Sequence, residues 1–95
     1  MIRQVLPYGA KEADEDYGDN RVLPGFIGIH THGAYGYDTN DARPEGLREW
    51  MRRIPEEGVT SILPTTVTQM PDVLTAAVAS VAKVVEEGYE GAQIL

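Results

Sequence analysis

The sequence predicts an α/β fold of the βαβα type, with parallel strands and an irregular N-terminal arm. Two short apolar stretches, 26–31 and 59–63, have strand character, and each is followed by a helical pattern. Equivalent points of the two strands lie about 32 residues apart, which is the spacing of a βαβ unit. Because such a crossover joins parallel strands, we expect both strands in one parallel sheet.

The predicted arm covers residues 1–21, and the βαβα unit covers residues 22–95. Residues 11–20 form an acidic run with almost no large apolar side chain, a composition that favours a loop. Nothing in the arm suggests chemistry.

The first strand follows a Pro-Gly turn and leads to the only two histidines of the chain, His30 and His32. Side chains alternate along a strand, so Gly28 and both histidines should share one face, opposite Ile27 and Ile29. The two imidazoles should therefore converge. Residues 33–37 are predicted to form a flexible loop. Its tyrosines, Tyr35 and Tyr37, could contact a substrate or merely cover the strand ends, and the sequence favours neither.

The first helix is predicted to begin at Pro44, to bury one apolar stripe and to end near Pro55 and Gly58. Its stripe consists of Leu47, Trp50, Met51 and Ile54. Arg43 occupies the N-cap, where it offers no acceptor to the free N–H groups.

A second helix is predicted over residues 71–87, ended by Gly88, with residues 91–95 beginning a third strand. We expect its wide apolar stripe to be mostly buried: Leu74, Ala77, Val78, Val81, Val84 and Val85. Thr65, Thr66 and Thr68 precede this helix, where such residues more often serve turns and caps than pockets.

Composition limits the functions that fit the chain. Ninety-five residues allow one modest core. The formal charge of −7 argues against a nucleic-acid partner, and Arg48, Arg52 and Arg53 lie among glutamates as a solvated face. No apolar run is long enough for a membrane span or signal peptide, so we expect no membrane partner and a cytoplasmic location.

The His-x-His pair suits a two-point metal clamp at the end of a parallel strand. With no cysteine in the chain, any metal must be held by nitrogen and oxygen. Asp38, Asp41 or residues of other sequence would have to supply a third ligand. The alternative is that the histidines are two hydrogen-bonded polar residues without a metal.

Two motifs resemble a known enzyme family. The first, Pro24-Gly25-Phe26-Ile27-x-Ile29-His30-x-His32-Gly33, resembles the opening of the amidohydrolase superfamily. The continuation resembles the N-acetylglucosamine-6-phosphate deacetylase family, and the likeness covers about residues 22–95: Gly33-x-Tyr35-Gly36-x-Asp38 and Gly58-Val59-Thr60-Ser61-x-Leu63-Pro64-Thr65-x-x-Thr68. The family usually has Asp at the position of Gly28, and often Ser or Thr at that of Arg43.

The resemblance implies that residues 22–95 are the first two βα units, about a quarter, of a TIM-like barrel. The arm would be a linker or a remnant of a small β-sandwich. A divalent metal, zinc or iron, would be held by His30 and His32, although some relatives replace this pair and use a single metal elsewhere. The complete enzyme would hydrolyse the acetamide of N-acetylglucosamine 6-phosphate to glucosamine 6-phosphate and acetate.

The family's catalytic aspartate and remaining ligands would lie beyond Leu95, so the resemblance assigns no catalytic or substrate-binding residue here. We therefore expect the isolated chain to be inactive. The alternative function is a non-catalytic oligomerising α/β module without bound metal. Unpaired strand edges predict self-association, as a homo-oligomer, in either case.

Overall fold

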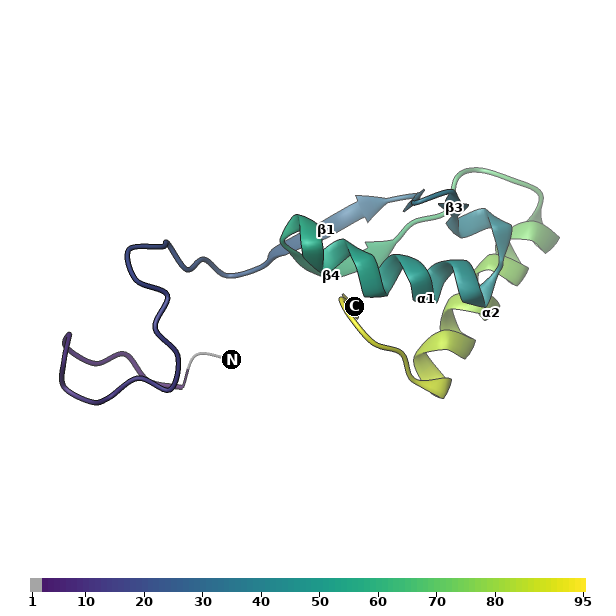
Figure 1. The fold of residues 1–95 in the computed structure, drawn as a ribbon. Helices are drawn as coiled ribbons and strands as arrows, with labels where there is room; N and C mark the ends of the chain where they lie inside the picture. The colour runs from purple at the N-terminus through teal and green to yellow at the C-terminus, as the bar shows by residue number, and fades with distance from the viewer. Residues whose placement is uncertain (1–2) are drawn as a thin grey trace.

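The computed structural model describes residues 3–95 as an α/β unit preceded by an extended arm (Figure 1). The elements follow in the order β1 (Phe26–Thr31), β2 (Gly33–Ala34), β3 (Tyr37–Asp38), the 3-10 turn η1 (Thr39–Asp41), α1 (Pro44–Arg53), the 3-10 turn η2 (Ile54–Glu57), β4 (Val59–Pro64), α2 (Pro71–Glu87) and β5 (Gln93–Ile94). Residues 3–25 contain no helix or strand, which confirms the irregular arm except at Met1 and Ile2, which lie outside the described residues. The chain extends 58 Å along its longest axis and 23 Å and 18 Å across it.

The main sheet is parallel, as the repeat of strand and helix predicts. Its strand order is β1-β4-β5, and Gly28 of β1 pairs with Ile62 of β4. The carboxyl ends of β1 and β4 therefore lie side by side, and Thr31 pairs there with Pro64. Whatever follows these two strands is brought to one edge of the sheet.

The prediction of a flexible loop over residues 33–37 was wrong. The segment forms an antiparallel hairpin of β2 and β3, with Gly36 in the left-handed conformation at its turn. Burial of Tyr37 fixes the hairpin, because its ring packs against Trp50 with the ring centroids 6.0 Å apart. A Cβ at Gly46 of α1 would lie 2.4 Å from the Tyr37 ring, so this glycine allows the close approach.

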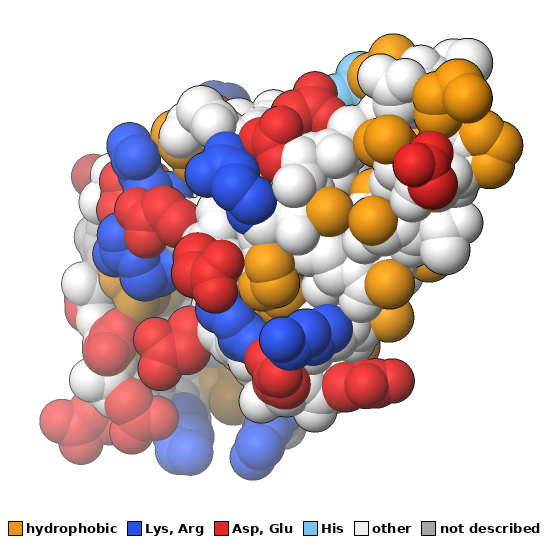
Figure 2. Space-filling view, turned by 90° about the vertical axis from the view of Figure 1, so that its right-hand side faces the viewer, with side chains coloured by type: hydrophobic (Ala, Val, Ile, Leu, Met, Phe, Trp, Pro, Cys, Tyr) orange, Lys and Arg blue, Asp and Glu red, His pale blue; other side chains and the backbone are white. Residues whose placement is uncertain are grey.

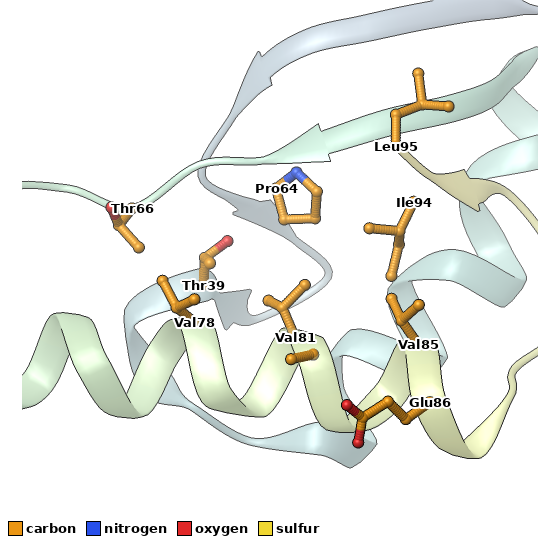
Figure 3. A pocket seen from close by; sticks show the side chains of 10 residues that line it. Thr39, Pro64, Thr66, Val78, Val81, Val85, Glu86, Ile94 and Leu95 are labelled. Carbon is orange, nitrogen blue, oxygen red and sulfur yellow. The ribbon is translucent and has the colours of Figure 1, made fainter.

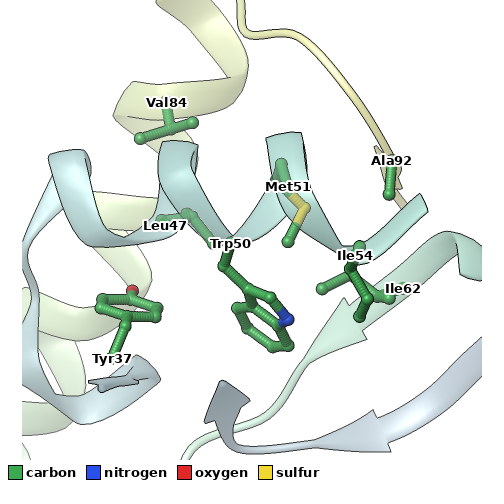
Figure 4. Close-up of a cluster of buried hydrophobic side chains, with 8 residues drawn as sticks. All are labelled: Tyr37, Leu47, Trp50, Met51, Ile54, Ile62, Val84 and Ala92. Carbon is green, nitrogen blue, oxygen red and sulfur yellow. The ribbon is translucent and has the colours of Figure 1, made fainter. Parts of the chain in front are cut away.

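The core lies between α1, the sheet and the hairpin (Figure 4). Trp50 is fully buried, as are Leu47 and Met51, which confirms the predicted stripe of α1. As predicted, the side chain of Arg43 makes no cap hydrogen bond among the described residues, and α1 gives way to η2 at Ile54.

Proline at position 55 leaves one carbonyl of α1 without its helical donor, and the chain before β5 bonds to this carbonyl. The carbonyl of Met51 would normally accept a bond from the N–H four residues later, but Pro55 has none. Ala92 supplies the missing donor from the other end of the chain, with its N–H nitrogen 2.9 Å from the Met51 oxygen. Gly91, at φ +102°, lets the chain pass close enough for this bond. β5 is thereby fixed against α1.

The bounds predicted for α2 are confirmed, but the predicted burial of its whole stripe was wrong. Ala77 and Val84 are buried, whereas Val78 is 62% exposed and Val85 is 47% exposed. Ile29 of β1 is likewise 74% exposed. The face of α2 that carries Val78 and Val85 is not covered by any other element within residues 3–95.

Charged side chains form the predicted solvated face beside α1. Arg48 pairs with Glu87 at 2.7 Å and Arg52 with Glu49 at 2.8 Å, and all four are partly or largely exposed. Figure 2 shows side chains of both charges grouped over one half of a face and hydrophobic side chains gathered over the other half. Among the described residues, no helix combines the length and apolar character that crossing a membrane requires.

Candidate metal centre

The two histidines converge, as strand alternation predicts. His30 lies in β1 and His32 directly follows it. Their ring centroids are 5.0 Å apart, with the ring planes nearly perpendicular at 83°. This separation is compatible with both rings binding one ion through nitrogens at about 2.0–2.1 Å.

The ring of His32 is held in one orientation by the chain that follows β4. Its Nδ1 lies 3.0 Å from the carbonyl oxygen of Thr65. Because a carbonyl oxygen only accepts, Nδ1 is the nitrogen that carries hydrogen in this contact. The lone pair of the neutral ring is then on Nε2, which is free to bind a metal ion.

The backbone of His32 is held separately by Thr39. Both the N–H and the hydroxyl of Thr39 donate to the carbonyl oxygen of His32, at 2.7 Å and 2.8 Å. Thr39 is only 1% exposed, so these bonds are shielded from water. His32 is therefore fixed at its ring and at its backbone by two different segments.

The structure does not bring Asp38 or Asp41 to the histidines as a third ligand. The carboxylate of Asp38 caps η1 by accepting the N–H of Asn40 at 2.8 Å. Asp41 accepts the N–H of Asp38 and pairs with Arg43 at 2.8 Å, and the hydrogen bond from Arg43 lowers the pKa of Asp41. Residues 3–95 contain no group of three or more His, Asp or Glu side chains placed to hold a metal ion. The two histidines could thus supply two ligands of a metal ion, and residues 3–95 place no third side-chain ligand beside them.

Both tyrosines of the hairpin have structural roles. Burial raises the pKa of Tyr37 to about 12, so its phenol stays protonated at neutral pH, inside the core. Tyr35 donates a hydrogen bond to Glu57, and the guanidinium of Arg53 lies 4.0 Å from the centre of its ring. These contacts tie the hairpin to η2 and to the last residue of α1.

Gly28 has room for a side chain. A Cβ at this position would lie 3.4 Å from Cγ2 of Ile62, which is an ordinary contact, and its φ is not in the left-handed region. The missing carboxylate is therefore a property of the sequence and is not imposed by the backbone.

A separate hollow lies between α2 and the ends of β4 and β5 (Figure 3). Its walls are mostly apolar and include Val78, Val81 and Ile94, with Thr66 and Glu86 among the lining residues. Neither histidine lines it. The histidine pair and this hollow are therefore distinct features.

Sequence reasoning missed Thr39, and it gave Asn40 only as a polar side chain beyond the loop, without a partner. Asn40 makes two bonds with the backbone of Val67: its Nδ2 donates to the Val67 carbonyl at 2.8 Å, and its Oδ1 accepts the Val67 N–H at 3.1 Å. The one local signal was the Asp-x-x-Asp spacing of a capping box at 38–41, which predicts a turn at these positions but not its distant partners.

Comparison with known proteins gives relatives that are named as amino-sugar-phosphate deacetylases. No family model matches the sequence. The N-acetylglucosamine-6-phosphate deacetylase of Bacillus subtilis is 55% identical over 51 residues, which are 54% of this chain and 13% of that protein. The enzyme of the same name from Vibrio furnissii is 39% identical over 88 residues, or 92% of this chain and 22% of the relative.

A third relative has a related name. The N-acetylgalactosamine-6-phosphate deacetylase of Escherichia coli O157:H7 is 34% identical over 92 residues, or 97% of this chain and 23% of the relative. This chain thus spans between 13% and 23% of the length of these three curated relatives. By sequence, the chain belongs to the N-acetylglucosamine-6-phosphate deacetylase family, of whose members it matches a segment.

Proposed function

We propose that this chain is a metal-binding segment of an enzyme that removes the acetyl group from N-acetylglucosamine 6-phosphate, releasing acetate. The observation that carries the proposal is the convergence of His30 and His32 at the carboxyl end of β1, in a chain related to deacetylases of this name. In the complete enzyme, βα units of this kind would continue into a TIM-like barrel, with the site at the strand ends.

Within the site, the residues of this chain hold and orient the imidazole nitrogens that would bind the metal. Thr39 fixes the backbone of His32, and the Thr65 carbonyl keeps hydrogen on Nδ1, so Nε2 faces the site as a lone-pair donor. His30 supplies the second nitrogen. These two nitrogens would hold a divalent metal, for which we propose zinc or iron, and the bound metal would supply activation of water and polarisation of the acetamide carbonyl. The remaining ligands and the proton-transferring group would come from other sequence.

Grafting tests this proposal. Residues 22–95 replace the equivalent segment of the Vibrio furnissii relative, which matches 92% of this chain, and acetate release from N-acetylglucosamine 6-phosphate is measured. We expect an active chimera whose rate falls at least about tenfold when His30 or His32 becomes alanine, because each supplies a metal ligand. Running the same assay with N-acetylgalactosamine 6-phosphate compares the two substrates that the relatives' names give.

The matched control is Asp41→Asn. This substitution should leave the rate unchanged, because Asp41 pairs with Arg43 and not with the histidines. A folded, metal-loaded chimera without activity would contradict the proposal. So would a chimera whose rate does not depend on either histidine.

The isolated chain also has features of a self-associating module, and we propose that it forms homo-oligomers. β1 and β5 each leave one edge of the sheet unpaired within residues 3–95, and Val78 and Val85 expose an apolar face of α2. Light scattering should give a mass above that of one chain. Val78→Glu should lower this mass, whereas Ala76→Glu, on the same helix but away from the hollow, should not. A monomer at every concentration would contradict self-association.

A further inference from the structure

Thr65 connects the ends of the two long strands. Its N–H donates to the carbonyl of Thr31 at 2.8 Å, and the N–H of Thr31 donates back to the Thr65 hydroxyl at 3.3 Å. The same hydroxyl donates to the carbonyl of Leu63 at 3.0 Å. The hydroxyl of Thr65 thus bonds both the end of β4 and the end of β1, and it fixes how the chain lies directly after β4.

The chain is held again two residues later. Asn40 bonds both the N–H and the carbonyl of Val67, as an adjacent strand would. The segment that begins at Thr65 is therefore fixed at two residues: Thr65 is bonded to Thr31 of β1, and Val67 is bonded to Asn40 of η1. The carbonyl of Thr65 has little freedom to turn away from His32.

That carbonyl is the acceptor for Nδ1 of His32. We propose that Thr65 is a positioning residue, which keeps His32 in the Nδ1–H form and thereby presents Nε2 to the metal. The metal part of this inference rests on the proposed function, whereas the choice of tautomer does not. Residues that orient a metal-binding histidine in this way typically change metal affinity by 10–100-fold when mutated.

The test uses the 95-residue protein and reads two quantities. Nitrogen-15 NMR of the metal-free protein at pH 8.5 gives the proportion of the Nδ1–H form at His32. Isothermal titration with zinc gives the affinity. Three variants are compared with the original chain: Thr65→Val, which removes the hydroxyl at nearly constant size, Thr65→Ser, which keeps it, and Thr66→Val as the neighbouring control.

We expect the Nδ1–H form to dominate at His32 in the original chain. Thr65→Val should reduce its proportion and weaken zinc binding about tenfold. Thr65→Ser and Thr66→Val should retain both values. The indole N–H signal of Trp50, a fully buried residue, reports whether each variant keeps its core.

The inference is overturned if Thr65→Val keeps both the tautomer and the affinity of the original chain, or if Thr65→Ser behaves like Thr65→Val. If the original chain binds no zinc, the proposed metal site fails, while the NMR measurement still decides the role of Thr65. Should Thr65→Val not fold, Asn40→Asp replaces it: the loss of the Nδ2 donor to Val67 should shift the tautomer in the same direction. An unchanged tautomer in that variant would count against the inference.

Discussion

Replacing Gly91 with alanine is expected to lower the free energy of unfolding by about 3 kcal/mol. A Cβ at this position would lie 2.0 Å from the carbonyl oxygen of Met51, and it would have to do so at φ +102°. Relief of the overlap would pull Ala92 away from Met51, whose carbonyl has no other helical donor because Pro55 follows. Since a small domain has only about 5–15 kcal/mol of stability, urea denaturation should show a large fall in the midpoint.

Gly36→Ala is the matched control. Gly36 also has a positive φ, +77°, but a Cβ there would meet nothing within 4 Å. This variant should lose only the cost of the left-handed conformation, about 1 kcal/mol. Equal losses in the two variants would mean that backbone conformation alone matters, and that the approach of Gly91 to Met51 does not stabilise the fold.

Local pattern was sufficient to predict β1, β4 and the two α-helices, but not the β2–β3 hairpin. The spacing of Leu47, Trp50 and Met51 predicted both a helix and its buried face, and Pro71 with Gly88 marked the ends of α2. The alternation of side chains along β1 predicted that the two imidazoles would converge. These features depend on neighbours within a few residues, which sequence periodicity reports directly.

Features that depend on distant partners could not be predicted in the same way. Tyr37 looked like a loop residue because its burial depends on Trp50 and on the absence of a side chain at Gly46. Nothing near Thr65 in the sequence shows that its carbonyl meets a ring 33 residues earlier. Val78 and Val85 have the spacing of buried residues, but burial also needs a covering element, which the sequence of the helix does not report.

Loss of either histidine is expected to weaken zinc binding by at least about a hundredfold, or about 2.7 kcal/mol. Only His30 and His32 bring imidazole nitrogens together, and no carboxylate among residues 3–95 joins them. A site with two protein ligands has no substitute when one is removed. If the carboxylate of Asp41 completed the site, Asp41→Asn would weaken zinc binding. We expect no change in zinc affinity, because Asp41 pairs with Arg43.

Calorimetric titration of the metal-stripped 95-residue protein with zinc tests the central claim most directly. The original chain and Asp41→Asn should bind one zinc per chain with equal affinity, and His30→Ala and His32→Ala should each bind at least about a hundredfold more weakly. Absence of zinc binding by the original chain, or binding that survives both histidine substitutions, would contradict a metal centre at the end of β1.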